Sequence, residues 1–306
     1  MKKIIEYSKR NTLLFFLFVI VKKYRNDFLS WKYDETKIIE KNYKRGTGKS
    51  LNLKNPLRYT EKIQWLKINY RNSAMNMCAD KYSVRKFVKD KGLGHLLNEI
   101  IAVYNHPSEI NLDELPGKFV LKTTHSSGWN IICTNKEKLK QNWFWWKKIL
   151  NIWINEDYSK YYQEWHYKGI QPRIICEKFI GDNNSGINDY KFFCFHGEIK
   201  LVQVDVERYS GHKQNYYDDN WNYVPMTADA LQHFDEGEHK PAFFEEMKKI
   251  SKILAEDFPF CRVDLFEWDK KIYFGELTFF DGSGYYKIEP EEFDFKMGEW
   301  LQLPLK

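Results

Sequence analysis

Residues 262–278, with the sequence RVDLFEWDKKIYFGELT, indicate the fold class of this chain, because two strand-like runs flank a short polar turn. The pattern predicts a β-hairpin with a three-residue loop. In that register Asp264 lies opposite Glu276, and Arg262 lies opposite Thr278. Because successive strand residues point to opposite faces, these four side chains share one face. The other face is apolar and is expected to contact the core through Val263, Leu265, Tyr273 and Leu277.

The opposed carboxylates of Asp264 and Glu276 predict a cation site. The Cβ atoms of directly opposed strand residues are about 5 Å apart, so two carboxylates there repel each other unless positive charge lies between them. Mg²⁺ prefers oxygen ligands and keeps coordination positions for phosphate oxygens. A surface hairpin with solvated acids is the alternative, but it gives no reason for Arg262 or for the uninterrupted apolar face.

Two upstream strands end in side chains suited to a nucleotide. Lys122 ends a strand immediately before the small, polar loop Thr124-His125-Ser126-Ser127-Gly128. The backbone N–H groups of such a loop form an anion-binding concavity, and the lysine adds a positive charge for phosphate. Glu177 ends another apolar strand, where its carboxylate can accept the adenine amino group while the following backbone groups read the ring edge.

Another glycine-containing segment, Gly46-Thr47-Gly48-Lys49-Ser50, looks like the end of a Walker A loop. That motif needs a glycine five residues before Gly48, where Tyr43 stands, and an apolar strand ahead of it. The chain has neither, so no P-loop is predicted.

The order of these elements resembles the ATP-grasp superfamily, and within it the TupA-like branch named after teichuronopeptide biosynthesis. The resemblance covers roughly residues 55–304. Four stretches carry it: EKIQWLK at 61–67, ADKYSVR at 79–85, DYKFFCF at 189–195, and GELT at 275–278 followed by Gly282-Ser283-Gly284.

The resemblance implies an α+β fold with mainly antiparallel sheets, in which two lobes clasp ATP, and the alternation of strand-like and helical patterns along the chain agrees with that class. A helical, basic and apolar segment over 1–54 would precede the ATP-grasp domain over 55–304. Lobe one would cover about 76–180 and lobe two about 181–304.

The resemblance also implies a role for each site residue. The residues expected to bind phosphate are Lys81, Lys122, Ser126, Ser127 and Gly128. Those expected to hold adenine and ribose are Glu177, Lys178, Ile180 and Asp189. Asp264 and Glu276 would hold Mg²⁺, and Arg262 together with Lys122 would stabilise charge in the phosphoryl and tetrahedral transition states.

At two positions the chain departs from the superfamily. Thr278 stands two residues after the second acidic ligand, where many members have asparagine, and its hydroxyl is the third candidate metal ligand. Trp129 follows the phosphate loop where a smaller residue is expected. Further candidates for contact with a carboxylate substrate or the γ-phosphate are Arg208, His212, Lys213 and Ser283, and a solvated polar loop is the alternative for the first three.

The N-terminal part of the chain concentrates its positive charge. Residues 1–50 contain 13 Lys/Arg and 5 Asp/Glu, whereas the whole chain has a net charge of +6. A nucleic-acid-binding body would spread basic residues over the fold, so no nucleic-acid partner is expected. Residues 11–21 are almost wholly apolar, and as a helix they rise only ~16 Å, too short to span a bilayer. The segment is expected either to lie in the membrane interface, held by its basic flanks, or to pack on the protein's own core.

The five cysteines are scattered singly, without a Cys-x-x-Cys pair, and four lie in or beside apolar runs. They predict buried thiols in a reducing compartment rather than disulfides or a zinc site. We therefore expect a cytoplasmic protein, peripheral on the inner face of the cytoplasmic membrane if its N-terminal segment binds lipid.

The leading functional hypothesis is an ADP-forming carboxylate–amine ligase that uses ATP and Mg²⁺ and forms an acyl phosphate. The resemblance implies cell-surface or capsule polysaccharide biosynthesis, in which an amino acid or similar amine is joined to a uronic acid on a small or lipid-linked saccharide. A glycosyltransferase is the alternative enzyme class, but the Asp-x-Asp common in metal-dependent members is absent from the sequence. A non-catalytic membrane-associated binding protein would not need the opposed acids.

Overall fold

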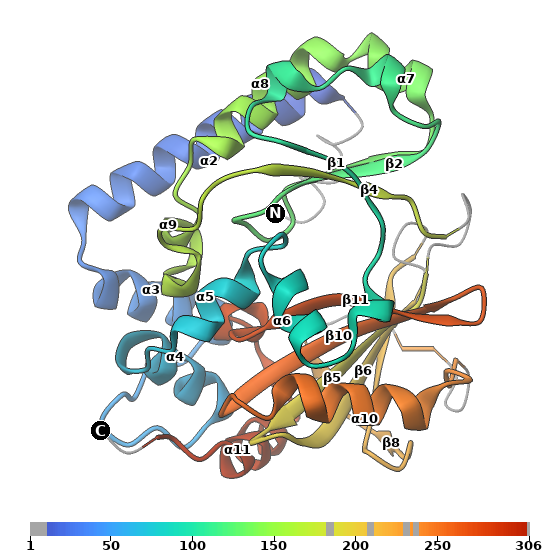
Figure 1. Cartoon of the computed structure of the whole chain (residues 1–306). Helices are drawn as coiled ribbons and strands as arrows, with labels where there is room; N and C mark the ends of the chain where they lie inside the picture. The colour runs from blue at the N-terminus through green and yellow to red at the C-terminus, as the bar shows by residue number, and fades with distance from the viewer. Residues whose placement is uncertain (1–10, 182–186, 207–210, 229–232, 235–238, 305–306) are drawn as a thin grey trace. The chain divides into compact units, whose positions relative to one another are not determined.

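The computed structural model describes residues 11–181, 187–206, 211–228, 233–234 and 239–304. The chain forms two compact units, each assembled from separate stretches of sequence (Figure 1). The first unit contains the residues up to Ile38 together with Ala79–Tyr82 and Asn98–Phe179, and the second contains Ile39–Cys78, Ser83–Leu97 and the chain from Ile180 onward. Both units combine helices with antiparallel sheet, which confirms the predicted α+β class.

The first unit contains a four-stranded antiparallel sheet in the order β1-β4-β2-β3. Its strands are β1 (Ile100–Tyr104), β2 (Phe119–Thr123), β3 (Asn130–Cys133) and β4 (Ile174–Lys178). Along β2 the side chains alternate, so that Phe119 and Leu121 are fully buried in the core while Lys122 points to the opposite face. Glu177 of β4 pairs with Val120 and therefore shares the face of Lys122.

Helices cover the apolar side of this sheet. The longer helices of the first unit are α2 (Thr12–Lys32) and α8 (Trp143–Ile154), and its short helices are α7 (Lys136–Gln141) and α9 (Ser159–Tyr162). Single 3₁₀ turns complete the unit at Pro107–Glu109, Leu112–Glu114 and Trp165–Tyr167. The helix α3 (Glu35–Thr47) crosses from the first unit into the second.

The apolar N-terminal run forms part of α2, whose first turn is capped by the side chain of Asn11. Phe15 and Val19 are buried in the core of the first unit, where Phe15 contacts the rings of Trp146 and Trp153. Packing on the core, one of the two expectations for this segment, is therefore observed for one face of the helix. Within the described parts of the chain, no helix combines the length and apolar character needed to cross a bilayer.

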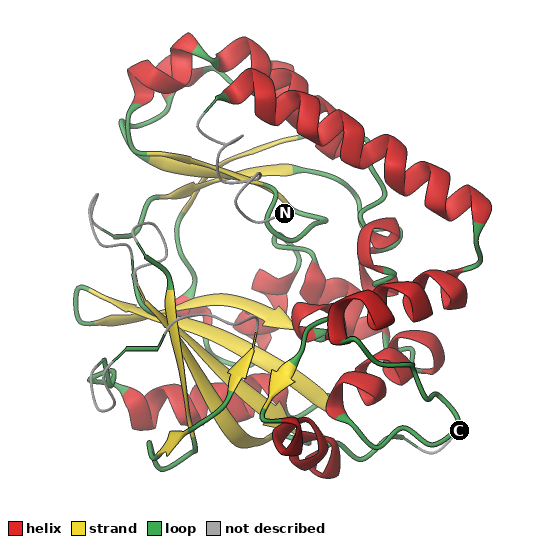
Figure 2. Ribbon diagram, turned by 180° about the vertical axis from the view of Figure 1, so that it is seen from behind, coloured by secondary structure: helices red, strands yellow, loops and turns green. Residues whose placement is uncertain are grey.

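The second unit contains a six-stranded antiparallel sheet in the order β11-β10-β5-β6-β7-β8. Its strands are β5 (Asp189–Phe195), β6 (Glu198–Val206), β7 (Lys213–Tyr217), β8 (Tyr223–Val224), β10 (Phe260–Trp268) and β11 (Lys271–Thr278). The amphipathic helix α10 (Phe244–Ala255) packs on the apolar face of β10, β5 and β6 (Figure 2). The other face therefore remains for polar side chains. A two-stranded sheet pairs β9 (Thr227–Ala228) with β12 (Ile288–Glu289).

The second unit also contains the helices α4 (Tyr59–Asn69), α5 (Ser73–Ala79), α6 (Val84–Asp90), η1 (Gly94–Leu96) and α11 (Glu291–Trp300), together with the short turn η5 (Asp281–Gly284). Of these helices, α4 packs on both η5 and α11. From α4, the buried Gln64 and Lys67 donate to the carbonyl of Ser283 at 2.9 and 2.6 Å. Two of the four stretches that carry the family resemblance, EKIQWLK and Gly282-Ser283-Gly284, are thus in direct contact.

All five cysteines are buried and unpaired, as predicted. Burial raises the pKa of the Cys78 and Cys176 thiols to about 12, which makes them poor nucleophiles.

Candidate active site

The hairpin of β10 and β11 brings the predicted acidic pair together. Asp264 pairs with Glu276, and Arg262 pairs with Thr278. All four side chains lie on the polar face of the six-stranded sheet, the face opposite α10. This part of the sequence-based geometry is confirmed.

The turn of the hairpin differs from the prediction. Trp268 pairs with Lys271, so the loop contains two residues, Asp269 and Lys270, rather than three. Both have positive φ, 49° and 57°, as a type I′ turn requires. A β-bulge that leaves Gly275 unpaired then shifts the register by one residue before the acidic pair is reached. The bulge compensates for the shorter loop, and this is why the acidic pair forms although the predicted loop was wrong.

The bulge also changes the apolar back face. Phe274 pairs with Leu265 and is buried, whereas Tyr273 pairs with Phe266 and is only partly buried. Tyr273 was therefore wrongly assigned to the core face. A single unpaired residue exchanges the faces of its neighbours, because side chains alternate along a strand.

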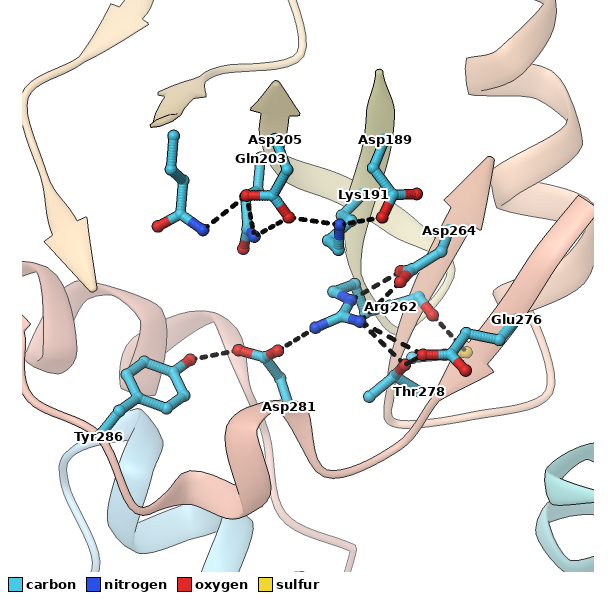
Figure 3. A network of polar contacts seen from close by, with 12 residues as sticks. Asp189, Lys191, Gln203, Asp205, Arg262, Asp264, Glu276, Thr278, Asp281 and Tyr286 are labelled. Carbon is cyan, nitrogen blue, oxygen red and sulfur yellow. Dashed lines mark hydrogen bonds and ion pairs between the residues drawn. The ribbon is translucent and has the colours of Figure 1, made fainter. Parts of the chain in front are cut away.

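The guanidinium of Arg262 lies at the centre of the acidic groups (Figure 3). Its Nε and Nη2 donate to the two carboxylate oxygens of Asp264 at 2.7 and 2.6 Å, and Nη2 is 3.7 Å from a carboxylate oxygen of Glu276. The Thr278 hydroxyl accepts from Nη2 at 3.1 Å and donates to Glu276 at 3.3 Å. Nη1 donates to Asp281. Arg262 thus supplies the positive charge that the opposed carboxylates require.

Asp281 was not assigned a role from the sequence. It begins η5, directly before the Gly282-Ser283-Gly284 stretch, and it is buried between Arg262 and the Tyr286 hydroxyl, which donates to its other oxygen. In the sequence, an acidic residue directly after two phenylalanines was the only sign that Asp281 has a special role. Its contact with Arg262 could not be predicted, because that contact depends on how η5 folds back.

Asp264 and Glu276 offer a donor set that suits Mg²⁺ bound together with phosphate. Asp264 is buried, and this burial raises its pKa to about 7 although the charge of Arg262 opposes the shift. The side chain of Glu276 is 41% exposed. One or two carboxylates, with phosphate oxygens and water completing the shell, are the usual ligands of Mg²⁺. Where the structure describes the chain, no three acidic, histidine or cysteine side chains cluster as a metal site on their own.

A second charged cluster lies on the same face of the sheet, one strand away. Lys191 of β5 pairs with Asp264 and is itself buried. Its ammonium group donates to Asp189 at 2.7 Å and to Asp205 at 2.5 Å (Figure 3). Asp205 also accepts from Gln214 at 2.8 Å and from Gln203 at 3.1 Å. The predicted ribose ligand, Asp189, is therefore held by Lys191, for which the sequence alone indicated no role.

Asp205 is buried, which by itself would raise its pKa. The close approach of His212 and the charge and hydrogen bond of Lys191 outweigh burial and lower the pKa of Asp205 below its ordinary value. Lys191 and Asp205 are both charged residues within mostly apolar strands. This pattern was the only sign in the sequence that the two residues have a role in the site. Their pairing follows only from the register of β5 and β6.

Three of the four candidate substrate residues are described, and each has different contacts. A ring nitrogen of His212 lies 3.2 Å from Asp205, and Lys213 begins β7, where it pairs with Val206. The carbonyl of Ser283 is occupied by the side chains of α4. Arg208 lies outside the described residues.

In the first unit the predicted phosphate loop contacts Lys81. The Lys81 backbone N–H donates to the Thr124 carbonyl at 3.0 Å, and its ammonium group donates to the Ser126 carbonyl. Ser126 is buried and its hydroxyl lies 2.5 Å from that of Thr123. Ser127 is partly buried and Gly128, with φ of 73°, is exposed.

The other predicted nucleotide residues lie along β2 and β4. Lys122 forms an ion pair with Glu177 at 2.6 Å. The backbone N–H of Lys178 donates to the Glu99 carbonyl at 3.0 Å, and its carbonyl accepts from Asn98 at 2.8 Å. Ile180 follows in the second unit. The roles of these residues toward adenine and phosphate stay predictions.

Trp129, which departs from the superfamily pattern, anchors the phosphate loop. Its ring stacks on Trp153 with centroids 5.7 Å apart and an interplanar angle of 7°, and it meets Tyr158 edge-on at 4.9 Å. Within the loop, His125 donates from Nε2 to the Trp153 carbonyl at 3.1 Å, and burial lowers the pKa of its imidazole. Both ends of the loop are therefore attached to the core of the first unit.

Comparison with known proteins identifies the family. The sequence matches the TupA-like ATPgrasp family over residues 61–302. No curated protein matches the chain.

Among solved structures, the chain is similar to D-alanine–D-alanine ligase from Bacillus anthracis (18% identity, 74% of this chain and 67% of that chain, TM-score 0.43). It is also similar to the same ligase from Helicobacter pylori (15% identity, 82% and 68%, TM-score 0.44). A third similar structure is the L-amino acid ligase from Bacillus licheniformis (13% identity, 74% and 49%, TM-score 0.41). The chain spans about two thirds of the length of the first two proteins and about half of the third.

The family match covers most of the chain and includes every predicted site residue. The chain therefore belongs to the TupA-like ATPgrasp family, and the predictions of an ATP-grasp fold and an ATP-dependent ligase are confirmed at the level of that family.

Proposed function

We propose that this protein is an ADP-forming carboxylate–amine ligase. The observation that carries the proposal is the arrangement of Arg262, Asp264 and Glu276 on one face of the second unit's sheet, with Arg262 hydrogen-bonded to Asp264 and 3.7 Å from Glu276. A cation held among carboxylates suits the transfer of a phosphoryl group, in which negative charge must be neutralised at the terminal phosphate.

In this proposal Asp264 and Glu276 would hold Mg²⁺ together with ATP, and Thr278 orients Glu276 through its 3.3 Å hydrogen bond. The bound metal would supply charge neutralisation on the terminal phosphate. Arg262 contacts the transferring phosphoryl group, and Asp281 holds the guanidinium from its other side.

The remaining contacts to ATP are proposed as follows. Lys81, Lys122 and the N–H groups of the Ser126-Ser127-Gly128 loop bind phosphate. Glu177, with the backbone of Lys178 and Ile180, holds adenine, which requires the 2.6 Å pair of Lys122 and Glu177 to open. Asp189 accepts the ribose hydroxyls, and we add Lys191 as the residue that positions it, on the basis of their 2.7 Å hydrogen bond.

The reaction proceeds in two steps. An oxygen of the substrate carboxylate attacks the γ-phosphorus, the bond from that phosphorus to the β–γ bridging oxygen breaks, and ADP leaves. The amine then attacks the acyl carbon, inorganic phosphate leaves with the electrons of the carbon–oxygen bond, and the amine nitrogen loses a proton. The acyl phosphate must be shielded from water between the steps.

For the substrates we propose a uronic acid as the carboxylate and an amino acid or similar amine as the nucleophile, in cell-surface polysaccharide synthesis. This proposal is supported by membership of a family named after teichuronopeptide biosynthesis. The exposed apolar side chains of α2 favour a lipid-linked form of the saccharide.

The test measures the products of ATP in the presence of Mg²⁺ and candidate uronic acids. ADP and phosphate should appear only when a carboxylate is present, and hydroxylamine should replace the amine and yield a hydroxamate. AMP and pyrophosphate would instead indicate adenylation and contradict the proposal. Transfer of a sugar from a nucleotide-sugar without ATP would favour a glycosyltransferase.

A further inference from the structure

The helix α2 has a second apolar face, opposite the one that packs on the core. Phe15 and Val19 point inward, whereas a stripe of large apolar side chains points to solvent. The exposed stripe consists of Leu13, Leu14, Leu17, Val21, Tyr24, Phe28 and Trp31. At 100° per residue these positions fall within about a third of the helix circumference, and they extend over about 27 Å of its length.

The exposure of this stripe is unusual for a helix of a water-soluble domain. Tyr24 is 66% exposed and Trp31 is 81% exposed. Single exposed apolar residues are common, but a continuous stripe normally marks a surface that contacts another molecule or a membrane. Tyrosine and tryptophan are the side chains that favour the boundary between lipid and water.

A neighbouring helix extends the apolar surface. α8 lies beside α2 in the first unit, and its Trp145 ring contacts Phe16 with centroids 5.3 Å apart. The next aromatic ring, Phe144, contacts Trp145 at 5.0 Å and is itself 60% exposed. Figure 1 shows α2 and α8 running alongside each other over much of their length.

The charges around the stripe are mainly positive. Arg25 and Lys32 are exposed on α2, and Lys147 and Lys148 are exposed on α8. The ammonium of Lys32 lies 5.6 Å from the Phe28 ring centroid. The one acidic residue of α2, Asp27, is paired with Lys23 at 3.1 Å. The exposed face therefore combines apolar side chains with basic residues.

We propose that this face of α2 lies in the plane of a membrane and binds the surface of a bilayer that contains anionic lipids. An apolar face with basic residues at its borders is the composition of helices that lie in the membrane interface. The basic residues complement the negative charge of the lipid headgroups. A second copy of the chain fits less well, because two-fold symmetry would place the same positively charged face against itself.

The helix thus uses both apolar faces, one for the protein core and one for lipid. Deletion of residues 1–25 would be an ambiguous test, because it removes Phe15 and Val19 from the core of the first unit. Substitutions confined to the exposed stripe avoid this problem.

The test uses the full chain and sedimentation with vesicles made either of phosphatidylcholine alone or of equal parts phosphatidylcholine and phosphatidylglycerol. At low salt the wild-type protein should bind the anionic vesicles more tightly than the vesicles of phosphatidylcholine alone. The triple variant Leu17→Gln/Val21→Gln/Phe28→Gln should lose at least about tenfold in vesicle affinity, because three exposed apolar side chains that would enter the lipid are replaced by polar ones. The matched control Leu57→Gln/Ile132→Gln/Ile253→Gln, at exposed positions outside the stripe, should stay within about twofold of wild type.

The charge contribution is tested by Arg25→Gln and Lys148→Gln. Each should reduce affinity for anionic vesicles about fivefold and leave binding to neutral vesicles unchanged. The proposal is overturned if the wild type binds neither vesicle, or if the triple variant binds as well as the control. It is also overturned if the wild type is a dimer that the triple variant dissociates and vesicles do not bind, since a second copy then covers the stripe. Because no nucleotide is needed, failure here would leave the proposed ligase activity untouched.

Discussion

At the scale of single residues, the site depends on charges that are buried in pairs. Arg262 is shared among Asp264, Glu276 and Asp281, and Lys191 is shared between Asp189 and Asp205. Burying a charged group costs desolvation free energy unless an opposite charge lies beside it. In both clusters, ion pairs offset this cost on the sheet face. The side chains are therefore held in place before any ligand arrives, which favours electrostatic preorganisation.

Glu276→Gln should abolish magnesium-dependent ATP turnover with little effect on folding. Its side chain is 41% exposed, so the substitution would remove the proposed metal ligand without leaving a buried charge unpaired. We expect kcat to fall by on the order of 100-fold or more, because the Mg²⁺ proposed to neutralise transition-state charge would be held less well. The measurement is ADP release against Mg²⁺ concentration, with Glu267→Gln in the same hairpin as control. An unchanged magnesium dependence would show that Glu276 is not a ligand. Asp264→Asn should have the same effect on turnover but also weaken the fold, because the buried Arg262 loses one of its carboxylate partners.

Asp189→Asn should weaken binding of ATP but not of 2′,3′-dideoxy-ATP. If Asp189 accepts the ribose hydroxyls, loss of a charged hydrogen bond should lower ATP affinity about tenfold, while the analogue that lacks both hydroxyls is unaffected. Lys191→Met should likewise reduce the difference in affinity between ATP and the dideoxy analogue, because Asp189 is no longer held in position. Isothermal titration with the two nucleotides decides the point.

The same Lys191 variant should also be less stable, by about 3–5 kcal/mol, because two buried carboxylates lose their counter-charge. Stability alone does not separate a positioning role from a structural one. If Lys191→Met still distinguishes ATP from the dideoxy analogue as the wild type does, the lysine has only a structural role.

At the scale of elements, the hairpin and the phosphate loop are positioned by local backbone features. The hairpin depends on a type I′ turn at one end and on the bulge at Gly275 near the acidic pair. The phosphate loop depends on the stacking of Trp129 on Trp153, so a residue that departs from the superfamily pattern has a packing role. Both features can be disrupted without touching a ligand-binding side chain.

Gly275→Ala should displace Glu276 from Asp264. A Cβ at Gly275 would lie 2.8 Å from the Asp264 carbonyl oxygen and 2.9 Å from the Phe266 ring, so the bulge must open. We expect a loss of about 1–3 kcal/mol in the free energy of unfolding, together with weaker binding of Mg-ATP. Lys270→Gly, at a positive φ of 57° in the same hairpin, is the matched control and should be neutral or stabilising. Equal nucleotide affinity in Gly275→Ala and the wild type would contradict this role of the bulge.

The buried His125 of the phosphate loop should make stability depend on pH. Burial lowers its pKa from the ordinary value of 6.5 in the folded state, so below that pH the unfolded chain binds a proton that the folded protein does not. The free energy of unfolding should therefore fall as pH is lowered through the region below 6.5. Urea unfolding across this range should show a smaller slope for His125→Gln. His106→Gln, at an exposed position, is the control, and an identical slope in all three proteins would exclude His125 as the source.

At the scale of the whole molecule, the candidate nucleotide residues come from both units. The phosphate loop and Lys81 belong to the first unit, and the acidic hairpin belongs to the second. In the sequence these segments are separated by more than a hundred residues, and each unit is itself assembled from separate stretches.

If both units bind the same ATP, nucleotide should protect both segments at once. We expect slower backbone amide exchange at residues 124–128 and at residues 262–278 when ATP and Mg²⁺ are added to the full chain. Excess ligand at 100 times its Kd should also stabilise the folded state by about 2.7 kcal/mol. Protection confined to one segment would mean that the other does not bind ATP. Exchange of residues 244–255 on the opposite face of the second sheet serves as the internal control.

The sequence by itself determined the α+β class, the family and the opposition of Asp264 and Glu276. These rest on local signals, namely the period of apolar residues, the polar turn and short stretches of motif. The hairpin was predictable because its two strands are adjacent in the chain, and an error of one residue in the loop was cancelled by an unforeseen bulge. For the apolar N-terminal run, the residue types alone left two alternatives open; in the structure one face packs on the core and the other remains exposed.

Only the tertiary structure decided which distant charges meet. Lys191 with Asp205 and Arg262 with Asp281 are contacts between separate strands or between a strand and a turn, and many pairings of such residues are compatible with the same sequence pattern. The contact of the α4 side chains with Ser283 likewise could not be predicted from the sequence, because more than two hundred residues separate the partners. Local patterns determine which face a side chain occupies, whereas its partner depends on strand register and on how turns fold back, and these are determined by the packing of the whole unit.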